Sequence, residues 1–233
     1  MSALVLAQVE IRDRSELNCV QNNGFCPGWI KDHIGDYMDP LWRHVELTVA
    51  SVGCGFAIAF ALAILAHRRR WLGGPVVGVT GILYTIPSLA AFALLIPLTG
   101  FSFVTALIPL TAYTLLILFR NITAGLDNVP AEAVDAARGM GMSDRQILWR
   151  VELPLALPEI LAGLRLALTT IVGLATLAFY AGAGGLGEKI LTDISFKSNI
   201  ATAGVLCILL ALAFDVALLL VERFTLPWRR AHA

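Results

Sequence analysis

Residues 71–119 contain no Asp, Glu, Lys, Arg or His. At about 1.5 Å of rise per residue, a helical path of this length is sufficient for two crossings of a bilayer. Residues 47–66 are also uncharged, and one helix needs roughly 20 such residues to cross about 30 Å of hydrocarbon. Only 15% of the chain is charged, whereas soluble domains carry about 25% charged residues. The chain therefore needs lipid as its solvent.

These apolar stretches predict an all-α fold, a polytopic membrane helical bundle of about five transmembrane helices. The expected spans are residues 47–66, two crossings within 71–119, then 166–186 and 199–221. We expect the turn between the second and third spans near Thr99 and Gly100. The fifth span is interrupted by one acid, Asp215, for which Arg165 or a contact between subunits is the expected partner.

The positions of Lys and Arg predict the orientation, because basic residues are retained on the cytoplasmic side. With the N-terminus outside, most bases fall on inner segments, namely Arg68, Arg69, Arg70, Arg120, Arg138, Arg145, Arg150, Arg223, Arg229 and Arg230. The expected organisation is an extracytoplasmic tail at 1–43, a transmembrane domain at 44–225 with a cytoplasmic loop at 120–157, and a cytoplasmic tail at 226–233. The C-terminus is then inside.

The N-terminal tail has two features with open interpretations. Trp29, Tyr37 and Trp42 either anchor the tail at the membrane interface or belong to a solvated leader. Cys19 and Cys26 would lie on the oxidising side, where they either form a disulfide or stay free.

The polar segment at 130–154 has the pattern of two short helices. Pro130 suits a first helical turn, and the acids Glu132 and Asp135 suit the positive end of the helix dipole. Small residues then recur at helical spacing and predict one face, made of Ala133, Ala136, Ala137 and Met140.

Gly139 and Gly141 are expected to end the first short helix. Ser143 and Gln146 form a capping-box pattern that opens the second, and Pro154 is expected to close it. From the residues alone, the segment is either an L-shaped element that projects from the membrane or a structured loop between spans.

A broken helix is expected at Pro87, because proline removes a backbone hydrogen bond within the second span. Broken membrane helices often mark transport paths. The hypothesis is that a path is lined by polar residues of the second and fourth spans, namely Tyr84, Thr85, Pro87, Ser88, Thr169, Thr170 and Thr176. The alternative is that these residues make packing contacts and that the threonines bond to their own helix backbone.

No sequence pattern indicates catalysis, a cofactor, a metal or nucleic-acid binding. Gly182, Gly184 and Gly187 fit G-x-G-x-x-G but follow a membrane span rather than a strand, and no Gly-Lys-Ser/Thr ending follows them. We therefore expect a non-enzymatic chain that does not hydrolyse ATP itself. The glycines form either a flexible outer gate, a landing surface for a binding protein, or an ordinary loop.

The pattern of Asp135, Ala136, Ala137, Gly141, Val151, Leu153 and Pro154 resembles the EAA signature of ABC-importer permeases. Asp135 replaces Glu and Val151 replaces Ile in that signature. The resemblance implies that the segment docks into a cytoplasmic ATPase. It implies as coupling residues Glu132, Asp135, Ala136, Ala137, Met140, Gly141, Met142, Ser143, Leu153 and Pro154.

The wider resemblance is to permeases for glycine betaine, carnitine and choline, the osmoprotectant family. It is carried by residues 86–89, 136–142, 151–158 and 182–187. It implies a multi-pass subunit of the bacterial cytoplasmic membrane in contact with lipid. The implied partners are ABC ATPase subunits, a second permease copy or paralogue, and an extracytoplasmic substrate-binding protein. The alternatives are a permease for methionine or another amino acid, and a stand-alone channel or carrier.

Overall fold

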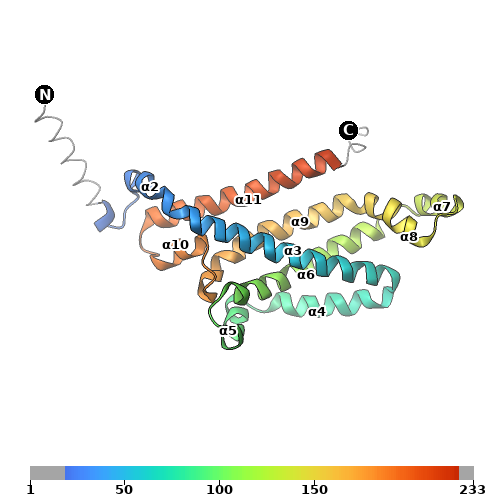
Figure 1. Ribbon diagram of the computed structural model, residues 1–233, viewed down its shortest axis with the longest axis horizontal. Coiled ribbons are helices and arrows are strands. Elements are labelled where there is room, and N and C mark those ends of the chain that lie inside the picture. The colour runs from blue at the N-terminus through green and yellow to red at the C-terminus, as the bar shows by residue number, and fades with distance from the viewer. Residues whose placement is uncertain (1–18, 226–233) are drawn as a thin grey trace, which may run out of the picture.

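The computed structural model describes residues 19–225, and the elements below belong to that part of the chain. These residues form helices and turns and no strand. Four helices are long and apolar enough to cross a membrane, and a sharply bent pair makes a fifth if it counts as one span. The expected all-α bundle is confirmed, and Figure 1 shows its long helices running along one common direction.

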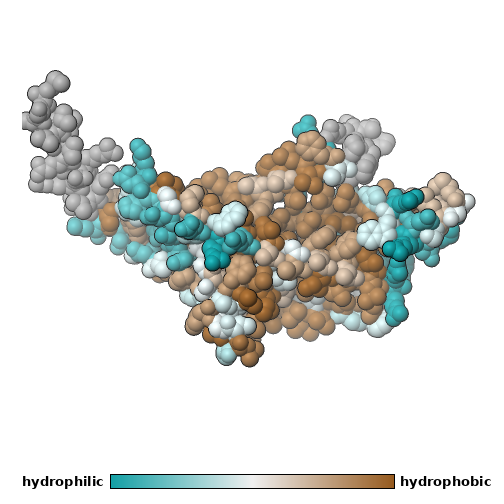
Figure 2. Space-filling view, viewed as in Figure 1, coloured by the Kyte–Doolittle hydropathy of each residue, from teal (hydrophilic) through white to brown (hydrophobic). Residues whose placement is uncertain are grey.

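The surface of the bundle is divided into an apolar middle and two polar ends. Figure 2 shows a brown central belt with teal residues at both ends of the long axis. One polar end carries α2 (Pro27–His33), and the other carries α7 (Ala131–Gly139) and α8 (Asp144–Ile147). Such a belt matches a protein whose middle is solvated by lipid tails and whose ends are solvated by water.

The first span is longer than its uncharged stretch. α2 and a 3-10 turn (Ile34–Tyr37) lead into α3 (Met38–Arg68), so the helix begins well before residue 47. An uncharged stretch predicts only the part of a helix that faces hydrocarbon. The polar first turns of the same helix are therefore not included in the predicted span. A Cβ atom at Gly55 would lie 1.7 Å from Thr114 Oγ1, so α3 crosses its neighbour in close contact at this glycine.

The second expected span is a bent pair, as Pro87 suggested. α4 (Gly73–Thr85) and α5 (Ser88–Thr99) meet at 91°. Ile86 adopts an extended conformation with φ −68° and ψ 126°, which is the region favoured before proline.

The third span, α6 (Phe103–Asp127), lies at the centre of the bundle between α3 and α9 (Leu153–Ala175). The turn expected near Thr99 and Gly100 is confirmed, and Gly100 has φ 69°. Ser102 then caps α6 by accepting a hydrogen bond from the Thr105 N–H.

The fourth span differs from the expected residues 166–186 at both ends. α8 continues through a π-helical turn (Leu148–Glu152) into α9, so the expectation that Pro154 closes a short helix is wrong. The π turn shifts the hydrogen-bond register just before Pro154, which accommodates the missing N–H of proline. The charge of Arg165 hid the early start of this span in the sequence.

The chain leaves the fourth span before residue 186. α9 is followed by a 3-10 turn (Thr176–Ala181) and a glycine-rich loop, and α10 (Leu186–Thr192) is a separate short helix. Gly182 has φ 75°, a left-handed conformation that ends the helical path. α11 (Lys197–Thr225) is the fifth span and includes the expected 199–221. The expected C-terminal tail at 226–233 lies outside the described residues.

Candidate coupling and transport sites

The elbow, which we define as residues 130–154, projects from one end of the bundle (Figure 1). Pro130 caps α7, and Gly141 has φ 80°, so the turn between α7 and α8 depends on a left-handed residue. The Met142 N–H donates to the Ala137 carbonyl at 3.2 Å and closes this turn. The expected capping box at Ser143 and Gln146 is present and opens α8.

The small residues of α7 differ in exposure. Ala137 is buried and Ala133 is half-buried, whereas Ala136 is exposed and Met140 is 71% exposed. α7 therefore packs one edge of the predicted small-residue face against the rest of the elbow and leaves the other edge exposed. What remains exposed is a surface around Ala136 and Met140 that a partner is free to cover.

The acids and bases on the elbow are mostly solvated. Arg138 lies 3.5 Å from Asp135 and 3.9 Å from Asp144, and all three side chains are more than half exposed. Exposed pairs of this kind contribute about 0–1 kcal/mol to stability. These charges therefore add little to folding and are accessible to a docking partner.

The base of the elbow is fixed to the first span by a contact that our sequence analysis missed. His67 Nε2, at the end of α3, lies 3.1 Å from Glu152 Oε2 in the π-helical turn. Both side chains are largely buried, with exposures of 24% and 14%. Glu152 lies within the run 151–158 but that run gives no partner for it, so only the fold brings the two residues together across 85 positions of sequence.

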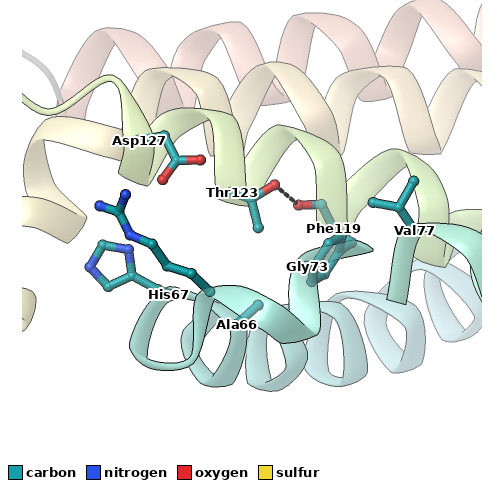
Figure 3. Close-up of a pocket in the computed structure, with 8 residues that line it drawn as sticks. Ala66, His67, Gly73, Val77, Phe119, Thr123 and Asp127 are labelled. Atoms are coloured by element: carbon teal, nitrogen blue, oxygen red, sulfur yellow. Dashed lines mark hydrogen bonds between the residues drawn. The ribbon is translucent and has the colours of Figure 1, made fainter. Parts of the chain in front are cut away.

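Two pockets flank His67. One, with a volume of about 450 Å³, lies between the neighbouring ends of α3, α4 and α6, with His67 and Asp127 at one end and Val77 at the other (Figure 3). The second, about 560 Å³, opens between the end of α3 and the elbow, and its lining includes Arg68, Arg138 and Arg145. Of these two pockets, the second is lined by elbow residues, so the elbow leaves a gap against the end of α3.

The helix break between α4 and α5 is held by a tyrosine of α6. The Tyr113 hydroxyl donates to the Ile86 carbonyl, which the break deprives of its helical donor. Tyr84 packs its ring against Tyr113 in a T-shaped arrangement. Of the path candidates here, Tyr84, Thr85 and Pro87 are exposed, and Ser88 is half-buried.

The threonine candidates bond to their own helices, as the packing alternative expected. Thr85 donates to Ile82, Thr170 donates to Leu166, and Thr176 donates to the Gly173 carbonyl. Thr169 donates to carbonyls of its own helix in the same way. Their hydroxyls are thus satisfied without a ligand. α5 packs against the 3-10 turn that contains Thr176. Thr169 and Thr170 lie in α9, before this turn.

The glycine run, residues 182–187, forms a packed junction at the opposite end of the bundle. A Cβ atom at Gly182 would lie 2.8 Å from Phe101, and one at Gly187 would lie 1.7 Å from the Thr176 carbonyl oxygen. These glycines are required for close backbone approach. Of the three alternatives given above, a flexible outer gate, a landing surface and an ordinary loop, this close packing disfavours the flexible gate.

A buried histidine joins the glycine run to two spans. His44 of α3 is fully buried, and its Nδ1 accepts from the Leu186 N–H at 3.3 Å. The ring is therefore protonated on Nε2, which donates to the Val172 carbonyl of α9 at 3.0 Å. A lone histidine gives no sequence signal of such a role, and our sequence analysis did not single it out.

The N-terminal segment is attached to the start of α11, near Ser198. Cys19 and Cys26 form a disulfide, which resolves the open alternative. The Cys26 N–H donates to Ser198 Oγ at 2.7 Å. Tyr37 is buried and donates to Asn199, so neither alternative, an interfacial anchor or part of a solvated leader, holds for this tyrosine. Only tertiary packing, which sequence pattern does not reveal, removes this tyrosine from the interface.

Asp215 has the expected partner. Its Oδ1 lies 2.7 Å from Arg165 Nε, and the pair joins α11 to α9. Within residues 19–225 no group of His, Cys, Asp and Glu could hold a metal ion.

A membrane bundle with a projecting elbow is the architecture of a transport permease. Residues 53–226 match the family model described as binding-protein-dependent transport system inner membrane component, and the chain belongs to this family. It is therefore a multi-pass membrane permease.

Among curated relatives, the chain is similar to the carnitine transport permease protein OpuCB of Listeria monocytogenes, with 36% identity over 76% of this chain and 82% of the relative. It is 37% identical to the osmoprotectant import permease protein OsmW of Salmonella typhimurium, over 80% and 90% of the two chains. It is 32% identical to the choline transport system permease protein OpuBB of Bacillus subtilis, over 83% and 90%.

Solved structures show the same fold. An inward-facing conformation of the MetNI methionine ABC transporter superposes with a TM-score of 0.71 at 24% identity, covering 81% of this chain and 95% of that chain. An amino acid ABC transporter superposes with a TM-score of 0.64 at 15% identity, over 83% and 96%. The relatives identified by sequence are thus the osmoprotectant permeases, and the structural neighbours support the fold.

Proposed function

We propose that this permease forms the translocation path of an ABC importer for quaternary-ammonium osmoprotectants of the glycine betaine, choline and carnitine type. The observation that carries this proposal is the 32–37% identity to the carnitine, choline and osmoprotectant permeases over most of each chain. The methionine alternative is supported only by a likeness of fold at 24% identity.

The elbow is proposed as the docking site for a separate cytoplasmic ATPase. Its exposed residues include Glu132, Asp135, Ala136, Met140 and Ser143. Gly141 supplies the turn that presents them, and Leu153 with Pro154 begins the long helix that would carry the motion into the membrane. Closure of an ATPase pair would push on the elbow and tilt this helix, converting nucleotide binding into alternating access.

The proposed orientation places the elbow inside and the N-terminal tail at 1–43 outside. The bases Arg68, Arg69 and Arg70 at the elbow end of α3 support this orientation. The Cys19–Cys26 disulfide at the other end supports it as well, because disulfides persist in oxidising compartments. The transmembrane domain would then span residues 44–225, with its cytoplasmic loop within 120–157.

The proposed assembly has two permease subunits, either two copies or this chain and a paralogue, with two ATPase subunits. An extracytoplasmic binding protein would deliver the solute to the end that carries the glycine run. The path would pass the helix break at Tyr84, Pro87 and Ser88. The sequence lacks a phosphate-binding loop, so ATP hydrolysis would belong to the partner.

Reconstitution tests the proposal directly. The chain, co-expressed with a matching ABC ATPase and binding protein, should support ATP-dependent uptake of radiolabelled choline, carnitine or glycine betaine into proteoliposomes. Excess methionine should not compete. Uptake of methionine but of no quaternary amine would contradict the proposed substrate class, and conduction by the chain alone would contradict the importer.

A variant at the elbow tests coupling in the same vesicles. Gly141→Asp should abolish uptake while leaving membrane insertion intact, because it adds a negative charge at the turn with φ 80° that presents the proposed docking surface. Gly141→Asn is the matched control, since Asn tolerates the left-handed region and should retain more uptake. Wild-type uptake by Gly141→Asp would contradict the coupling role.

A further inference from the structure

The Tyr84 side chain is placed unusually for a residue of a membrane helix. It lies about 16 Å along α4 from Gly73, and its neighbour Tyr113 lies about 15 Å along α6 from Phe103. Both rings are thus near the middle of a hydrocarbon layer roughly 30 Å thick. Tyr84 is nevertheless 40% exposed, whereas Tyr113 is buried.

The hydroxyl of Tyr84 makes lipid an unfavourable neighbour for this exposed side chain. Within residues 19–225 it has no hydrogen-bond partner. A hydroxyl without a hydrogen-bond partner is strongly disfavoured in an apolar medium. This favours a polar environment for the Tyr84 side chain at mid-membrane depth, beside the broken helix.

The orientation of the ring is fixed through three linked contacts. Pro87 breaks the helix, the freed Ile86 carbonyl accepts a hydrogen bond from the Tyr113 hydroxyl, and the Tyr113 ring meets the Tyr84 ring at 85° with centroids 6.0 Å apart. Because Tyr113 is buried in α6, Tyr84 is held in place before any solute arrives. A preorganised ring of this kind loses little freedom on binding.

We infer that Tyr84 is a binding site for the quaternary ammonium group of the solute within the translocation path. This inference rests on the proposed function and adds a recognition residue to it. A quaternary ammonium group has no N–H to donate, so an aromatic face is the physically suited partner. Asp215, the acid deep in α11, does not provide a free carboxylate for the ammonium group, because Arg165 already binds it. In a two-fold assembly each copy would present the same ring to one path.

A series of aromatic replacements separates the cation–π role from packing. In the reconstituted importer, Tyr84 is replaced by phenylalanine and by mono-, di- and trifluorinated phenylalanines, which withdraw electron density from the ring while changing its shape little. We expect Tyr84→Phe to retain most choline uptake and the rate to fall stepwise with fluorination, by about tenfold at the trifluoro ring. The rate of choline uptake by the Tyr84→Leu variant should fall at least as far.

The same series at Phe92 of α5 is the matched control, because that ring is buried at 1% exposure near the same break and should show no stepwise fall. ATP hydrolysis should be maintained in every variant. Equal choline uptake by all Tyr84 rings, or by Tyr84→Leu, would overturn the inference while leaving the importer intact. A wild-type importer that moves no quaternary amine would overturn the proposed function as well.

Discussion

At the scale of single residues, the glycine run packs closely against other segments because glycine has no side chain. Three of its members approach other segments so closely that a Cβ atom would lie 3.2 Å or less from its neighbours, at Gly182, Gly185 and Gly187. The approach lets the Leu186 N–H reach His44, so the glycines and the buried histidine form one structural unit.

Gly187→Ala should destabilise the protein by about 3 kcal/mol, the upper end of the usual cost of overpacking a well-packed site. The physical reason is that the new methyl group would lie 1.7 Å from the Thr176 carbonyl oxygen. The thermal unfolding midpoint in detergent measures the change. Gly173→Ala is the matched control, since nothing lies within 4 Å of its Cβ position and alanine favours a helix. Equal midpoints for both variants would contradict this account.

At the scale of elements, the His67–Glu152 contact links α3 to the elbow. Loss of this link should leave ATP hydrolysis intact and lower the uptake obtained per ATP. Hydrogen bonds to charged groups contribute about 1.5–3 kcal/mol, so we expect roughly a tenfold decrease for His67→Ala. The measurement is the ratio of choline uptake to phosphate release in proteoliposomes.

Two variants make this prediction specific. His67→Gln retains a donor that can reach Glu152 and should recover part of the ratio. Glu46→Gln breaks an exposed pair with Arg43, also near 3.2 Å but at the opposite end of α3, and should have no effect. An unchanged ratio in His67→Ala would show that the elbow does not act through α3.

The disulfide closes a loop within the N-terminal segment, next to the hydrogen bond from Cys26 to Ser198 of α11. Closing a loop across 7 positions contributes about 2 kcal/mol in the chain-entropy model. Replacing Cys19 and Cys26 by serine should therefore lower the unfolding midpoint by roughly 5 °C for a chain of this size. Cys54→Ala is the control, because Cys54 is a free thiol. The idea fails if reductant and the double variant both leave the midpoint unchanged.

The sequence predicted elements well where charge decides solvation and poorly where packing decides conformation. The spans followed from uncharged stretches, and the break followed from Pro87. The start of the fourth span was hidden because Arg165 is neutralised by Asp215, a contact 50 positions away. The capping box at Ser143 was readable because its chemistry is local, whereas His67 and Glu152 become partners only in the folded chain.

At the scale of the whole molecule, the proposed orientation predicts which thiols are accessible from outside the cell. In a variant with Cys54 and Cys207 replaced by alanine, Asp36→Cys should react with a membrane-impermeant maleimide in intact cells. Gln146→Cys, on the elbow, should react only after the membrane is opened. Labelling of the elbow in intact cells would show that the orientation is the reverse of the one proposed. It would also contradict the elbow as the docking site of a cytoplasmic ATPase.

The π-helical turn at the base of the elbow has a consequence for the entire subunit. Because the turn changes register without ending the helix, residues from Asp144 to Ala181 form one continuous rod of 38 residues, about 57 Å long. His44 donates a hydrogen bond to the Val172 carbonyl in the far part of this rod and accepts one from the Leu186 N–H of the glycine run. In the proposed importer, a force that the ATPase applies at the elbow would therefore pass along one unbroken helix to the end of the bundle that carries the glycine run.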